Sequence, residues 1–230
     1  MRFFLPALTL ALMASPVQSA ERSFTVTGFT KVRVDGAYKV KVTTNSAPFA
    51  RASGDASSLD ALTMDVQGAT LVIHPSRSSW GGYPGEVRKP VEISLGTHDL
   101  VSVWVNGAGS VAVDRVRGLS FDFAVEGPGA GSIAAVQVDQ LRVNLGGTAT
   151  ASIAGQAPRM SAQVRGSSSL DASSLAIRDA VILAEGPAIV KAAVANTAKV
   201  DAYGASSVQL TGSPACTSRV YGSATISGCK

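Results

Sequence analysis

A run of alternate glycines is the first feature that could do chemistry. Gly127, Gly129 and Gly131 follow an alternating apolar run in the stretch VEGPGAGSIAAV (125–136). A phosphate-binding glycine loop needs a helix directly after it, because the N–H groups at the helix N-terminus bind the phosphate oxygens. The residues that follow, SIAAVQVDQLRV (132–143), alternate as a strand does, and the Lys-Ser/Thr pair of a P-loop is absent. We therefore expect neither a nucleotide site nor any other cofactor.

Two acidic residues, Asp122 and Glu126, lie four positions apart in the preceding run. On a strand their side chains point the same way, with carboxyl groups about 13 Å apart. That separation is too long for the paired carboxylates of a glycosidase. No catalytic residues are predicted from this pair.

The two histidines, His74 and His98, flank a long insertion. Asp99 and Glu92 are the nearest acidic candidates for further ligands, but the four residues have no regular metal-ligand spacing. We interpret the histidines as surface or strand-end residues and predict no metal site.

The insertion itself, HPSRSSWGGYPGEVRKP (74–90), is the best candidate for an interaction site. Long loops rich in Gly, Pro and Ser are often functional or disordered. An exposed aromatic side chain with basic neighbours can stack on a sugar ring or anchor a protein contact. The alternative is that the loop folds back as a lid and packs Trp80 or Tyr83 against Trp104. The candidate binding residues are Arg77, Trp80, Tyr83, Arg88 and Trp104.

The elements that position these residues are set by a repeat of 18–20 residues. Apolar residues stand two, four and six positions before a glycine, with Ser218 the one exception, and a small residue stands two positions after it. The pattern predicts a strand, a glycine corner and a second short strand in each repeat. A period that recurs seven times is typical of a parallel β-solenoid. The corner glycines are Gly107, Gly127, Gly147, Gly166, Gly186, Gly204 and Gly222.

Stacked coils place equivalent residues about 4.8 Å apart. The glycine register then predicts three opposite-charge pairs and one tyrosine pair on outward positions: Asp122 with Arg142, Arg165 with Glu185, Asp201 with Arg219, and Tyr203 with Tyr221. After Gly127 and Gly147 the apolar residue comes two positions late, at Ile133 and Ile153. We therefore expect these two corners to be two residues longer and to protrude.

The N-terminal part is less regular. Gly36 fits the corner template, and LTMDVQGATLVI (62–73) fits it around Gly68. The expected organisation is an N-terminal β region (21–100) that begins the solenoid or caps its end, continuous with solenoid repeats in 101–230. The stretches DASSLDAL (55–62) and SSLAIRDA (173–180) could form a helical turn or two at most.

Several stretches together carry a family resemblance: FTKVRVDGAYKVKV (29–42), ATLVIHP (69–75) and the corners NGAGSV (106–111), EGPGAGSI (126–133), RGSSSL (165–170), YGASSV (203–208) and YGSATI (221–226). With these stretches the chain resembles the head GIN domain family, which is also described as putative auto-transporter adhesins. The resemblance implies a secreted or surface-exposed, single-stranded, right-handed β-helix without an established catalytic site.

Export is predicted from the N-terminus. Residues 1–20 have a positive start, a short apolar run and a small-residue end, the layout of a signal peptide. Oxidising conditions outside the cytoplasm favour a disulfide between Cys216 and Cys229, although two free thiols remain the alternative. The net charge of +4 is scattered along the chain, so no nucleic-acid stripe is indicated, and no later segment is apolar enough to span a membrane.

The sequence therefore favours a non-enzymatic, exported β-solenoid that is periplasmic, secreted or held at the cell surface. Its partner would be an envelope polysaccharide or a protein surface. The alternative function is a carbohydrate-active β-helix enzyme, either a polysaccharide lyase or a hydrolase. The oligomeric state does not follow from the sequence.

Overall fold

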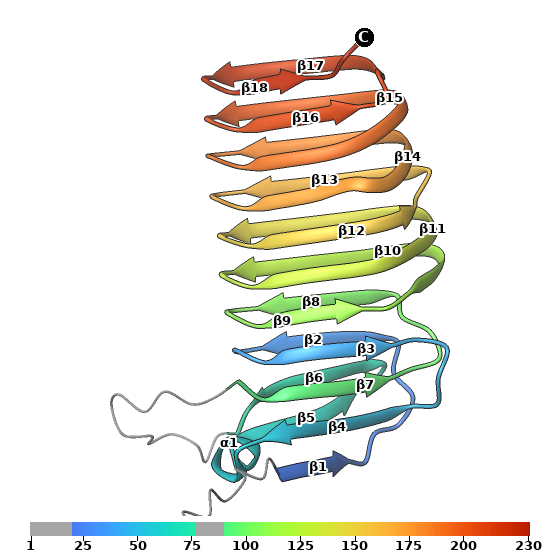
Figure 1. Ribbon diagram of the computed structural model, residues 1–230, viewed down its shortest axis with the longest axis vertical. Helices are drawn as coiled ribbons and strands as arrows, with labels where there is room; N and C mark the ends of the chain where they lie inside the picture. The colour runs from blue at the N-terminus through green and yellow to red at the C-terminus, as the bar shows by residue number, and fades with distance from the viewer. Residues whose placement is uncertain (1–19, 77–89) are drawn as a thin grey trace, which may run out of the picture.

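A computed structural model describes residues 20–76 and 90–230, and these form a flattened coil of stacked β-strands (Figure 1). Strands account for 71% of the chain and helix for 3%. The coils of the second half comprise β8 (Ser102–Asn106), β9 (Ser110–Val113), β10 (Val116–Gly127), β11 (Ala130–Gly147), β12 (Thr150–Gln156), β13 (Arg159–Arg165), β14 (Ser169–Glu185), β15 (Ile189–Gly204), β16 (Ser207–Thr211), β17 (Ala215–Gly222) and β18 (Thr225–Ser227).

Each coil contributes one strand segment before its glycine corner and one after it. The pre-corner segments form one parallel sheet, and the post-corner segments form a second one behind it (Figure 1). We call these the pre-corner sheet and the post-corner sheet. Because side chains alternate along a strand, every second residue enters the space between the sheets. The predicted parallel β-solenoid is confirmed, with seven corners and hence six complete turns between the first and the last.

The corner glycines form a continuous ladder. Gly127 pairs with Gly147 and Gly204 with Gly222, and each of the seven has a positive φ between 71° and 102°. A Cβ on Gly147 would lie only 3.2 Å from the backbone of Gly127. Glycine is therefore required here both for its left-handed backbone and for the close approach of neighbouring coils.

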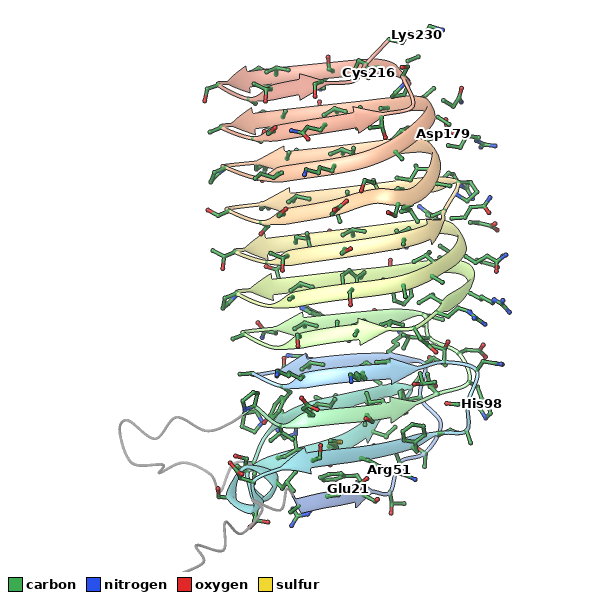
Figure 2. The ribbon with its side chains drawn as sticks, in the orientation of Figure 1. Glu21, Arg51, His98, Asp179, Cys216 and Lys230 are labelled. Carbon is green, nitrogen blue, oxygen red and sulfur yellow. A yellow bond between two sulfur atoms is a disulfide. The ribbon has the colours of Figure 1, made fainter. Side chains whose placement is uncertain are left out.

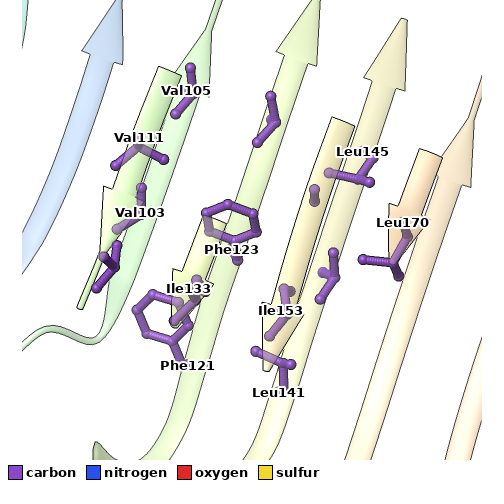
Figure 3. Close-up of a cluster of buried hydrophobic side chains, with 14 of the residues drawn as sticks. Val103, Val105, Val111, Phe121, Phe123, Ile133, Leu141, Leu145, Ile153 and Leu170 are labelled. Carbon is purple, nitrogen blue, oxygen red and sulfur yellow. The ribbon is translucent and has the colours of Figure 1, made fainter. Parts of the chain in front are cut away.

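The prediction of two longer corners is wrong. Ala130 pairs with Ser110 and Gly131 with Val111, so the Gly127 corner has the same length as its neighbour. Gly131 occupies the inward position that Val111 fills one coil earlier, and a Cβ there would overlap the ring of Phe123. The large Phe123 side chain thus fills the core volume that the glycine leaves free (Figure 3).

A single hydrophobic core runs along the solenoid between the two sheets. Phe121 and Phe123 are fully buried, with ring centroids 6.4 Å apart, and they pack among Val, Ile and Leu side chains of adjacent coils (Figure 3). Burying each such side chain contributes roughly 1.5–3 kcal/mol. The core therefore holds both sheets in their register.

The N-terminal strands do not follow one another in space. β2 lies between β6 and β8 in the pre-corner sheet, and β3 lies between β7 and β9 in the post-corner sheet (Figure 1). The coil built from β2 and β3 is thus inserted between two coils that come later in the chain. The strands concerned are β2 (Lys31–Asp35), β3 (Lys39–Thr43), β6 (Thr70–Pro75) and β7 (Glu92–Gly96).

Antiparallel elements close the core beyond these coils. β1 (Ala20–Phe24) pairs with β4 (Phe49–Gly54), β4 with β7, and β5 (Leu62–Gln67) with β6. The short helix α1 (Ala56–Asp60) lies beside them, as the expectation of one helical turn in 55–62 suggested. Gly68 lies in the turn of the antiparallel β5–β6 hairpin, so its assignment to the corner template was wrong. Residues 173–180 belong to β14 and are not helical.

The predicted disulfide is present and ties the last coil together. The sulfur atoms of Cys216 and Cys229 are 2.03 Å apart, and the backbone N–H of Lys230 donates to the carbonyl oxygen of Pro214 at 3.0 Å. Figure 2 shows Cys216 and Lys230 at the C-terminal end of the stack.

Candidate functional site

Four of the five predicted binding residues, Arg77, Trp80, Tyr83 and Arg88, lie outside the described residues. The described strands on either side of these residues pair in parallel with the next coil, β6 with β2 and β7 with β3. Among the described residues, one pocket of about 320 Å³ lies on the post-corner sheet, and another of about 340 Å³ lies beside Pro75 and Pro90. The second is lined by Ala37, Tyr38, Ser58, Ala61, Pro75, Pro90 and Val91.

Trp104, the fifth predicted residue, lies in β8 and faces outward from the pre-corner sheet. Its side chain is 48% exposed, and the guanidinium carbon of Arg33 lies 5.4 Å from the centroid of its ring. A cation over an indole ring at this distance is attracted by the negative face of the ring. The pair therefore fixes the indole on its β2 side and leaves it accessible to solvent.

Residues of the next two strands continue the outward column of Trp104 across the pre-corner sheet. Ala124 of β10 pairs with Trp104, and Asn144 of β11 pairs with Ala124. The single methyl group of Ala124 thus stands between an indole and an amide side chain. In the neighbouring outward column Asn106 pairs with Glu126, which pairs with Gly146.

Most charged groups around Trp104 are already paired. Arg33 lies 2.9 Å from the carboxylate of Asp35, and Arg142 lies 3.2 Å from that of Asp122. The Asn106 amide donates to Asp35 at 3.5 Å, which is a weak hydrogen bond. Glu126 has no such partner among the ion pairs of the described residues, and its carboxylate lies over Gly146, where a Cβ would overlap it.

The predicted charge ladder is confirmed in two of three cases. Besides Asp122 with Arg142, Arg165 lies 3.0 Å from Glu185. Asp201 and Arg219 pair in the predicted register, but the ion pairs within 4.0 Å in residues 20–76 and 90–230 do not include them. Such exposed pairs each contribute less than about 1 kcal/mol, so their main value is to mark the register.

A second aromatic group lies at the other end of the same sheet. The rings of Tyr203 and Tyr221 stack with centroids 4.9 Å apart and planes 7° from parallel, as the register predicted. Their exposed fractions are 37% and 54%. The rings face each other along the stacking direction, so much of their flat surface is already used in the pair.

Acid–base chemistry is not concentrated near Trp104. The perturbed carboxyl groups lie elsewhere: hydrogen bonds from Ser173 lower the pKa of Asp171, and the pKa of Asp179 is lowered to about 2. At Asp179 the largest cause is the Thr197 hydroxyl, followed by Arg178 and Asn196. Figure 2 places Asp179 at the bend opposite the glycine corners, where its hydrogen bonds link two coils. These shifts therefore reflect structural hydrogen bonds.

The histidines lie apart from any ligand cluster. The His74 ring lies 3.2 Å from the carboxylate of Asp65, its partner strand's residue, and His98 lies in the link before β8. Within the described ranges, no group of three or more His, Cys, Asp or Glu residues could hold a metal ion.

Sequence reasoning missed the role of Arg33. The signal was present, because aligning Gly36 with Gly107 puts Arg33 opposite Trp104, and the structure pairs the two residues. The contact is hard to see in the sequence because β3, β4, α1, β5, β6 and β7 lie between residues 33 and 104 in chain order.

The fold and this exposed sheet define an adhesin-like parallel β-solenoid. The chain belongs to the family described as "Putative auto-transporter adhesin, head GIN domain", whose model matches residues 28–214. This confirms the family resemblance seen in the sequence. No curated protein sequence matches the chain.

Solved bacterial structures share the fold at low sequence identity. A putative adhesin from Bacteroides fragilis has a TM-score of 0.79 at 15% identity, covering 91% of this chain and 95% of its own. A putative lipid binding protein from Parabacteroides distasonis has a TM-score of 0.69 at 19% identity, covering 92% and 96%. A putative adhesin from Parabacteroides merdae has a TM-score of 0.65 at 14% identity, again covering 92% and 96%.

Proposed function

We propose that the protein is an exported, non-enzymatic binding module that contacts a bacterial envelope or cell-surface partner through its pre-corner sheet. The observation that carries the proposal is the exposed Trp104 on a long, flat, rigid sheet. Exposed aromatic side chains on a rigid scaffold are typical anchors for binding. The adhesin family and the adhesin-like neighbours support the same function.

Export is supported by two features of the chain. Residues 1–20 have the pattern of a signal peptide, and the Cys216–Cys229 disulfide fits an oxidising compartment. Among the described residues, no helix is long and apolar enough to cross a membrane.

The carbohydrate-active enzyme is not favoured by the geometry. A catalytic site would need free acidic and basic groups that converge on one point. Asp122 is engaged by Arg142, and Glu126 lies four residues along the same strand, so the two carboxylates do not converge on one point.

Co-sedimentation of the mature chain with envelope fractions tests the proposal. We expect the protein to be recovered in the periplasmic or surface fraction of its own cells, and to sediment with purified envelope. It should release no reducing or unsaturated sugar ends from envelope polysaccharide. Recovery in the cytoplasm, failure to sediment with envelope, or release of sugar ends would each contradict the proposal.

A further inference from the structure

We propose that Trp104 and the gap over Ala124 form a binding site for a neutral pyranose unit of a polysaccharide. This inference rests on the proposed binding function and names the ligand class for it. We call the site the Trp104 patch and define it as Trp104, Asn106, Asp122, Ala124, Glu126 and Asn144, which come from β8, β10 and β11.

The indole of Trp104 has one free face. β8 lies between β2 and β10 in the sheet, and Arg33 of β2 covers the ring on one side at 5.4 Å. On the other side the next residue in the column is Ala124, whose methyl group is too short to cover the ring. A sugar ring, which has an apolar C–H face, can stack on an indole held in this way.

Polar groups surround the gap. The side chains around Ala124 include the amides of Asn106 and Asn144 and the carboxylates of Asp122 and Glu126. The Ser102 hydroxyl and the Arg142 guanidinium lie on the same face. Amides both donate and accept hydrogen bonds, and carboxylates accept them from hydroxyl groups. A ring edge with several hydroxyl groups is the ligand that matches an apolar platform bordered by such side chains.

The charges around the patch balance. Arg33 is matched by Asp35 at 2.9 Å and Arg142 by Asp122 at 3.2 Å. Lys31, opposite Ser102 in the sheet, offsets the negative charge of Glu126. A surface whose charges balance gives no net attraction for phosphate or uronate groups. We therefore commit to a neutral sugar, and an acidic polysaccharide or single-stranded DNA would be the contrary result.

Fluorescence of Trp104 provides a direct test, because the chain has only two tryptophans. In a Trp80→Phe background Trp104 is the sole indole emitter. The probes are four neutral glycans (dextran, laminarin, galactomannan and chitopentaose) with polygalacturonate and single-stranded DNA as acidic comparators. We expect a saturable change in emission with at least one neutral glycan, and none with the two acidic probes.

Matched variants separate stacking of a sugar on Trp104 from non-specific adsorption to exposed aromatic side chains. Ala124→Leu fills the gap at an outward strand position and should weaken binding by at least about tenfold, as loss of a central contact does. Ala124→Ser keeps the gap and should bind within about twofold of the parent. Tyr221→Ala removes an exposed aromatic group at the far end of the sheet and should leave binding unchanged.

The outcomes distinguish this site from the proposed function. If the chain still sediments with envelope but Trp104→Ala and Ala124→Leu do so equally well, the sugar site is wrong and the binding function stands. Preference for an acidic probe, or no response to any neutral glycan, likewise overturns the sugar site. If the unmodified chain does not sediment with envelope, both proposals fail.

Discussion

The N-terminal end of the solenoid is covered by antiparallel strands and a helix, whereas the C-terminal end exposes the inward side of its last coil. At the first end Leu59 of α1 and Leu62 of β5 are 3% and 4% exposed. At the second end Val220 of β17 is 48% exposed, although Ala202, its partner one coil earlier, is fully buried. Figure 1 shows both ends of the stack.

The two ends differ in how the core opening and the free strand edge of the outermost coil are covered or restrained. At the N-terminal end, Arg22 of β1 donates to the carbonyl oxygen of Leu59 at 3.1 Å and lies 2.7 Å from Asp60, so strand and helix are joined across the core opening. At the C-terminal end the described strands pair β17 with β15 alone, and the Cys216–Cys229 disulfide restrains the edge. One end is covered by packed elements, whereas the other keeps an exposed edge that a covalent link restrains.

The largest effect is expected from truncating the same kind of side chain at both ends. Leu59→Ala should lower the free energy of unfolding by about 2–5 kcal/mol, because it removes a buried side chain from a packed core. Val220→Ala should change it by less than about 0.5 kcal/mol, because the side chain is half exposed. Urea unfolding of the two variants measures both values. Equal losses would show that the ends are closed alike.

Loss of the disulfide should have the next largest effect. Replacing Cys216 and Cys229 by Ser opens a link across a sequence separation of 13 residues. Such links stabilise by about 3 kcal/mol, mainly by limiting the unfolded chain.

Hydrogen exchange locates that loss. In the double variant the amides of β17 and β18 should exchange faster, while those of β4 and β5 should keep their protection, since they are far from the link. Faster exchange at β4 and β5 as well would argue against an independently held C-terminal end.

The smallest effect is expected at acid pH. The pKa of Asp179 is lowered to about 2, first by the Thr197 hydroxyl and then by Arg178 and Asn196, so its charged form stabilises the fold. A lowered pKa gives stability that is present above the unfolded value near 4 and is lost as the pH falls through about 2.

Asp179→Asn should therefore be less stable than the parent at neutral pH and approach it as the pH falls from about 4 to about 2. Thermal unfolding between pH 2 and 7 measures the difference. A gap between the two proteins that stays constant with pH would exclude the carboxylate charge as its source.

Much of the solenoid followed from the sequence because stacking repeats the same contacts. The glycine period by itself predicts the corner ladder, the Tyr203–Tyr221 stack and the Asp122–Arg142 ion pair, and the structure contains all three. The prediction of longer corners was wrong because it assumed that an apolar residue must fill the inward position after the corner, whereas Gly131 fills it. The exchange of volume between Phe123 and Gly131 involves two positions on opposite sheets, which a column-by-column alignment does not compare.

The alternation of apolar residues and the recurring glycines were enough by themselves to determine a parallel β-solenoid, its register and its outward columns. Only the tertiary structure decided that the β2–β3 coil is inserted between later coils, and so that Arg33 covers one face of Trp104. The physical reason is that all these strands share the same period-2 pattern and can pair with several neighbours. Which edge each strand takes is settled by packing across the whole core, and that choice placed Arg33 against Trp104.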